Sequence, residues 1–119
     1  MTRVGMIVWS ALVLAAGEGH ADRFFDGNKL YALCTSADYT EQAECVGYAE
    51  GTVDLMEWIR EMGKRPPCVP HAVVGREIRD IVVDYLHDNP QSRPAVASVL
   101  ILDALDWAWR CHAGPPSSD

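Results

Sequence analysis

The chain has 119 residues, 23% of them charged, and its formal net charge at pH 7 is −7. A protein this acidic repels phosphate backbones and anionic lipid headgroups, because binding to either depends on lysine and arginine. The composition therefore argues against a nucleic-acid or membrane-surface partner. It leaves a basic protein partner open.

The N-terminus is typical of a secretory signal peptide. Arg3 provides a positive charge, and an uncharged apolar run follows from Val4 to Ala16. A membrane-spanning helix needs about 20 apolar residues, and this run is shorter. Small residues then predict cleavage after Ala21, with cleavage after Gly17 as the alternative.

We therefore expect an exported protein, with residues 1–21 removed and residues 22–119 forming the mature chain. That length suits one domain and not two. No second apolar run of spanning length follows, so we expect no membrane association after cleavage. An even number of cysteines in a short exported domain indicates two disulfides with three pairings open. The four cysteines are Cys34, Cys45, Cys68 and Cys111.

The first half of the mature chain predicts two helices. Asp26 to Asn28 provides capping residues for a short helix that reaches Cys34. Thr40 is expected to cap a long second helix, and Gly63 to end it as a left-handed cap. The apolar residues of this second helix recur at steps of three and four, which places them in a stripe along one side of a helix. They are Cys45, Tyr48, Ala49, Thr52, Leu55, Met56 and Ile59.

Two more helices are predicted after the proline-rich segment 64–70, which cannot be helical. The third is expected from about Val73 to His87. The fourth should begin with Ser92 as its N-cap and a proline in its first turn, and run to about Arg110. It is apolar nearly all round, so it should be the most buried element. With residues 114–119 as a disordered tail, the prediction is an all-α, single-domain bundle of about four helices.

The helix positions favour one pairing of the cysteines. Cys34 and Cys45 lie at the facing ends of consecutive helices across a short turn, where the sulfurs can meet. A disulfide between Cys68 and Cys111 would tie the proline-rich segment to the end of the last helix. We predict these two pairs.

A zinc site is the alternative use of the second cysteine pair. Cys68 is followed by His71 at C-x-x-H spacing, and Cys111 is followed directly by His112. An oxidising compartment favours the disulfide, so we predict no metal and no cofactor. Motifs for a serine nucleophile, a phosphate-binding loop and haem attachment are absent from the sequence. We therefore predict no catalytic residues and no enzyme activity.

Four carboxylates share one face of the long second helix: Glu50, Asp54, Glu57 and Glu61. Like charges at this spacing destabilise a helix by a few tenths of a kcal/mol per pair. They form either a solvated face or a docking strip for a basic partner.

Two glycines, Gly47 and Gly51, lie beside this acidic strip. Glycine inside a helix costs about 0.5–1 kcal/mol relative to alanine, which indicates that another backbone approaches closely here. That contact is either inside the monomer or across a dimer. Near the C-terminus, Trp107 and Trp109 are two residues apart and cannot share one helix face, so one of them is expected to be exposed.

An ordered set of short motifs runs through nearly the whole mature chain. It comprises Phe25 to Leu30 before Cys34, Cys45 to Gly51 with Asp54, Cys68 to Pro70, Tyr85-Leu86 with Asn89-Pro90, and the alanine- and leucine-rich last helix ending at Cys111. Together with the signal peptide and the four cysteines, this set resembles the Tai-type immunity proteins of type VI secretion.

The resemblance implies a periplasmic helical protein that binds and occludes a peptidoglycan amidase effector, often as a homodimer, with no chemistry of its own. We expect the acidic strip to contact this partner. The segment from Arg60 to Pro67 is expected to protrude into the amidase, with Lys64, Arg65 and Pro66 making the contact.

Two other classes of protein fit the same features. One is a small periplasmic acid-stress chaperone, which would unfold or dissociate at low pH and expose apolar surface. The other is a structural envelope protein without an inhibitory role. The second disulfide opposes opening in acid, which favours the inhibitor over the chaperone.

Overall fold

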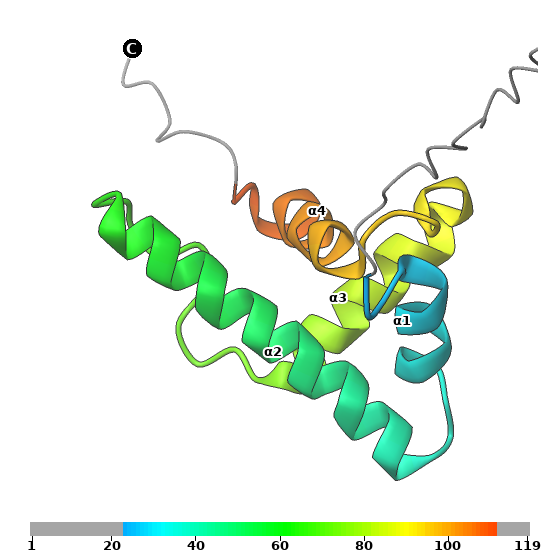
Figure 1. The fold of residues 1–119 in the computed structure, drawn as a ribbon. Helices are drawn as coiled ribbons and strands as arrows, with labels where there is room; N and C mark the ends of the chain where they lie inside the picture. Colours follow the sequence, from blue (N-terminus) through cyan, green and yellow to red (C-terminus); the bar gives the residue numbers. More distant parts are fainter. Residues whose placement is uncertain (1–22, 112–119) are drawn as a thin grey trace, which may run out of the picture.

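The computed structural model describes residues 23–111, and these form four α-helices and one short 3-10 turn (Figure 1). The helices are α1 (Gly27–Cys34), α2 (Tyr39–Met62), α3 (Gly75–Asp88) and α4 (Ala97–Trp109), and the turn is η1 (Pro90–Ser92). Within this range there is no strand, only an isolated bridge between Asp26 and Val96. The all-α prediction is confirmed. The proposed signal peptide and the tail 114–119 lie outside the described residues.

The start of α1 follows the prediction from its capping residues. The Asp26 carboxylate accepts a hydrogen bond from the Lys29 backbone N–H at 2.8 Å. This bond satisfies one of the amides that the first turn of a helix leaves without a partner.

The start of α2 differs from the prediction by two residues, whereas its end lies at Gly63 as predicted and differs only in conformation. Asp38, and not Thr40, is the N-cap: its Oδ1 accepts from the backbone amides of Thr40 and Glu41 at 2.8 and 3.1 Å. At the other end Gly63 has φ −83°, and the left-handed residue is Lys64, with φ 55°. The left-handed glycine cap was therefore a wrong prediction, because the chain reverses one residue later.

The start of α4 also differs from the prediction. Ser92 lies in η1, and α4 begins only at Ala97. The preceding residues pair with the segment before α1: Gly27 donates to the Ala95 carbonyl at 3.0 Å, and Ala97 donates to the Phe25 carbonyl at 3.1 Å. This pairing holds the chain extended where the sequence predicted a first helical turn.

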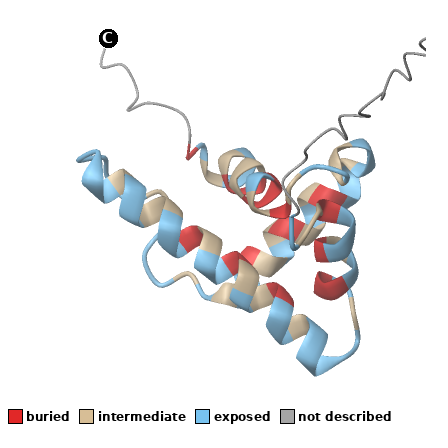
Figure 2. Ribbon diagram, in the orientation of Figure 1, coloured by how far each residue is buried: buried red, intermediate tan, exposed pale blue. Residues whose placement is uncertain are grey.

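The core lies where α1, α3 and α4 meet the first half of α2 (Figure 2). Among the described helices α4 buries the most residues, as its composition predicted. These are Ala97, Leu100, Ile101, Ala104 and Leu105.

The apolar stripe of α2 is buried only in the first half of the helix. Cys45, Ala49 and Val53 are its buried residues, whereas Leu55 is 58% exposed and Ile59 is 56% exposed. The C-terminal half of α2 extends beyond the other helices and is largely exposed (Figures 1 and 2). The apolar stripe therefore belongs to the core only in the first half of the helix.

Both predicted disulfides are present. The Cα–Cα distance is 5.1 Å for Cys34–Cys45 and 5.2 Å for Cys68–Cys111, within the usual range for a disulfide. No cysteine is left as a thiolate ligand. Residues 23–111 contain no group of three His, Cys, Asp or Glu side chains that could hold a metal, and His112 lies outside this range.

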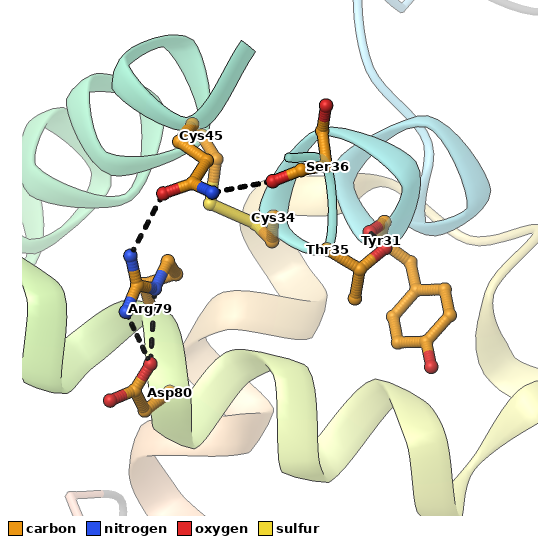
Figure 3. The surroundings of a disulfide bond; sticks show 8 residues. Tyr31, Cys34, Thr35, Ser36, Cys45, Arg79 and Asp80 are labelled. Atoms are coloured by element: carbon orange, nitrogen blue, oxygen red, sulfur yellow. Dashed lines mark hydrogen bonds and ion pairs between the residues drawn. A yellow bond between two sulfur atoms is a disulfide. The ribbon is translucent and has the colours of Figure 1, made fainter. Parts of the chain in front are cut away.

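A chain of polar contacts accompanies the first disulfide (Figure 3). Gln42 donates to the Ser36 carbonyl and accepts from Arg79 at 3.3 Å, and Arg79 pairs in turn with Asp80 at 2.8 Å. The turn between α1 and α2 is thereby tied to α3 as well as cross-linked by sulfur.

Candidate protein-binding surface

Two side chains of α2, Glu57 and Arg60, hold the following loop against the helix through hydrogen bonds. Glu57 accepts hydrogen bonds through Oε1 from the backbone amides of Cys68 and Val69, both at 2.9 Å. One turn later, Arg60 donates through Nε to the Pro66 carbonyl at 3.0 Å and through Nη1 to the Cys111 carbonyl at 2.6 Å. We call these four hydrogen bonds, together with the Cys68–Cys111 disulfide, the strap.

The strap determines what protrudes from the molecule. Arg60, where the protruding segment was predicted to begin, lies inside α2 and faces inward to the strap. The loop turns at Gly63–Arg65 and is held back against α2 at residues 66–69. The outermost element is therefore the end of α2 with its turn, which we call the tip. Lys64, Arg65 and Pro66 are exposed there.

The four acidic residues do not share one environment. Glu50, Asp54 and Glu61 are exposed, whereas Glu57 is half-buried and engaged in the strap. A surface hollow of about 560 Å³ lies against this face. Its lining residues are Asp54, Glu57, Trp58, Glu61, Arg65 and Pro67. The structure thus brings three of the four carboxylates, all but Glu50, and part of the tip together around one hollow.

An apolar groove of about 590 Å³ opens between α2 and α4, on another side of α2. Its lining residues are Gly47, Tyr48, Gly51, Thr52, Leu55, Met56, Ile59, Arg60, Arg65, Ser98, Leu102 and Cys111. The sequence did not predict this groove, although Gly47 and Gly51 beside the acidic strip indicated a close contact on α2.

An aromatic pair joins α3 to α4 away from the groove. The rings of Tyr85 and Trp107 lie 6.4 Å apart between centroids. Burial, and then the nearby carboxylate of Asp103, raise the pKa of Tyr85. Trp107 is 60% exposed and Trp109 is half-buried, which confirms that the two tryptophans do not share a face.

The described surface offers contacts with another protein. Its exposed features are an apolar groove, a row of carboxylates and a cationic tip, all carried by one cross-linked helical scaffold. No helix within residues 23–111 has the length and apolar character to cross a bilayer. The fold and surface therefore define a small, disulfide-linked, helical protein whose exposed features suit a protein partner.

Comparison with known proteins places the chain in a family. The family model of the Rap1a immunity proteins matches residues 26–111, from the N-cap of α1 to the cysteine that follows α4. The chain belongs to the Rap1a immunity protein family. No curated protein and no solved structure gave a significant match.

Proposed function

We propose that the protein is a periplasmic immunity protein that binds a peptidoglycan amidase effector of type VI secretion and occludes its active site. Membership of an immunity family across nearly all described residues is the observation that carries the proposal. The two disulfides support an oxidising compartment such as the periplasm. The resemblance of the motifs to Tai-type proteins supports an amidase as the target, and it also supports a homodimer.

The strapped tip supports inhibition by occlusion. An inhibitor loop that is already held in one conformation loses less entropy on binding than a free loop does. Glu57 and Arg60 hold the tip from one side, and the Cys68–Cys111 disulfide anchors the following segment to α4. In this proposal Lys64, Arg65 and Pro66 enter the amidase groove.

The acidic strip has a different part in the proposal. Carboxylates at the rim of an interface raise the association rate of a basic partner more than they raise the final affinity. Glu50, Asp54 and Glu61 are exposed and free to act in this way. For Glu57 a direct contact with the effector stays a prediction, and any such contact must coexist with its two bonds to the loop.

Co-expression with exported amidases tests the proposed function. Cells that export a candidate amidase to the periplasm are scored for lysis with and without the protein. The wild-type protein should rescue cells from at least one amidase in a broad panel, and rescue from none would overturn the amidase assignment. Shortening Lys64 to Pro66 should abolish rescue while the far-UV circular dichroism stays unchanged.

Charge reversal tests the steering role separately. Replacing Asp54 and Glu61 together by lysine should slow association with the effector and reduce its dependence on salt. Asp84→Lys on α3 is the matched control, because Asp84 is also exposed but lies on another helix. If the double variant and the control bind at the same rate at every salt concentration, the acidic strip does not steer.

A further inference from the structure

Trp58 belongs to the C-terminal half of α2, which extends beyond the other helices (Figure 2). It is 58% exposed, and it belongs neither to the core nor to the apolar side chains that pack against the core. It lines the hollow beside the strap, so the exposed ring borders a concave surface. Tryptophan is enriched where proteins contact one another and often dominates the binding energy there. The position of Trp58 is therefore typical of a binding residue.

Two carboxylates flank Trp58 on the same side of the helix. Asp54 lies four residues before it and Glu61 three residues after it, and residues at these spacings are neighbours on a helix surface. Both carboxylates are exposed and line the hollow, and neither forms an ion pair within residues 23–111. The ring thus has an anion about one turn away in each direction.

A third carboxylate lines the hollow and has one oxygen still available. Glu57 is half-buried, and its Oε1 accepts both hydrogen bonds from the loop. Its Oε2 has no partner among the residues that the structure describes. The two strap donors are neutral amides, so no cation compensates the charge of Glu57 in this part of the chain.

The charges around the hollow do not balance. Its lining residues include three carboxylates but a single guanidinium, that of Arg65. Arg65 forms no ion pair with these carboxylates in the described range. A hollow lined by charges of one sign concentrates the field and attracts ions of the other sign. This surface therefore combines an excess of negative charge with an exposed aromatic ring.

We propose that the hollow binds an arginine side chain of the effector, with the guanidinium over the ring of Trp58 and its N–H groups donating to Asp54 and Glu61. The second oxygen of Glu57 would accept a further N–H group. A guanidinium meets these requirements together, because it is planar, stacks on aromatic rings and presents five donors in a fixed fork. The inference rests on the proposed function and adds the type of residue that the effector presents.

The chemistry of the hollow favours arginine over lysine. An ammonium group is a compact and strongly hydrated charge, and it would leave the flat face of the ring without a stacking partner. The location favours the effector as the source of the arginine. Arg65 belongs to the tip and also lines the hollow, so an effector that receives the tip comes against the hollow as well.

Helix α4 offers a matched comparison within the same chain. Trp107 is 60% exposed, and Asp103 precedes it by four residues, as Asp54 precedes Trp58. Three residues after Trp107 the sequence has Arg110, a cation in place of the second carboxylate. A cation at this position opposes the binding of another cation, so Trp107 should not bind arginine.

Titration with a capped glycine–arginine–glycine tripeptide tests the hollow without any effector. The isotope-labelled mature protein is followed by NMR, and the indole resonance of Trp58 is identified by its loss in Trp58→Leu. This resonance should shift and approach saturation at millimolar peptide, whereas the resonance of Trp107 should not move. The tripeptide with citrulline keeps the planar side chain without the charge, and it should bind at least about fivefold more weakly.

Variants locate the binding, which is then followed through the backbone amides of residues 54–61. Asp54→Asn combined with Glu61→Gln removes both charges at nearly constant size and should weaken arginine binding about fivefold. Trp58→Leu should weaken it about threefold. Trp107→Leu should leave it unchanged. Thermal unfolding confirms that each variant folds.

Several results would overturn the proposal. These are equal binding of the arginine and citrulline peptides, unchanged binding in the double variant, and a Trp107→Leu effect as large as that of Trp58→Leu. Equally tight binding of the lysine tripeptide would overturn the assignment to arginine. If the wild type self-associates in sedimentation and the arginine peptide dissociates it, the hollow holds an arginine of another copy, which also overturns the proposal.

The lysis assay tests the effector as the source of the arginine. Trp58→Leu should reduce rescue by the protein, and Trp107→Leu should not. Rescue that is unchanged in Trp58→Leu would overturn this source. The peptide titration contains no effector, so arginine binding by the hollow fails or stands separately from the immunity function.

Discussion

Replacing Glu57 by alanine should destabilise the domain and free the loop after α2. The two backbone amides that its carboxylate holds, on Cys68 and Val69, would lose their acceptor at 2.9 Å. No other protein acceptor is recorded for either amide in the described residues. Water would replace the carboxylate only in part, because both residues are half-buried.

The expected loss follows from the strength of these bonds. A hydrogen bond to a charged group contributes about 1.5–3 kcal/mol, and the partial exposure of Glu57 lowers that contribution. Allowing about 1 kcal/mol for each bond gives a loss of about 2 kcal/mol for Glu57→Ala. Glu57→Gln keeps an acceptor oxygen without the charge, so its free energy of unfolding should fall by about half as much as that of Glu57→Ala.

Equilibrium unfolding in urea measures the free energy of unfolding of each variant relative to wild type. A loss of about 2 kcal/mol is a large part of the 5–15 kcal/mol typical of a domain, and it lowers Tm by roughly 10 °C at this size. Amide hydrogen exchange at residues 68 and 69 should accelerate in Glu57→Ala and less so in Glu57→Gln. Surface substitutions ordinarily change the free energy of unfolding by no more than about 0.5 kcal/mol. If both variants stay within that range of wild type, the strap does not stabilise the domain.

Three further predictions concern stability. Gly27→Ala should lower the free energy of unfolding by at least about 2 kcal/mol, because the new methyl would lie 2.6 Å from a backbone oxygen. Gly51→Ala should instead raise it by about 0.5–1 kcal/mol, because the new methyl has open space. Equal urea midpoints for the two variants would contradict both expectations. Lys64 has a left-handed φ, which destabilises a non-glycine residue by about 1 kcal/mol. Lys64→Gly should remove this strain and raise Tm slightly, and a lower Tm would contradict that account. Replacing Cys68 and Cys111 together by serine should lower the free energy of unfolding by about 4 kcal/mol, since the loop they close spans 43 residues. A variant as stable as wild type would refute this expectation.

Local signals were sufficient to predict most of the fold. Asp26 as a cap, Asn89-Pro90 as a stop and the apolar surface of α4 each act within a few residues of the place they determine. The Cys34–Cys45 pairing followed from two helix ends that lie close together in sequence, and it left Cys68 to pair with Cys111. The start of α4 could not be predicted in this way, because it depends on pairing between residues 25–27 and residues 95–97, which are far apart in sequence.

The candidate surface was less predictable than the fold. Periodicity identifies which side of α2 is apolar, but it does not show what covers that side. It therefore did not show that Leu55 and Ile59 lie where the helix has already extended past the core. Glu57 was grouped with the other carboxylates because its bonds depend on the path of a loop eleven and twelve residues further on.

The position of Cys111 has a practical consequence for attaching labels. Cys111, the last residue that the structure describes, lines the groove, and its carbonyl accepts a hydrogen bond from Arg60. A fluorophore or affinity tag fused directly after Cys111 would begin beside whatever fills the groove and would compete with it. An attachment point on an exposed side chain of α3, such as Asp84, lies on another helix and leaves the groove rim unencumbered.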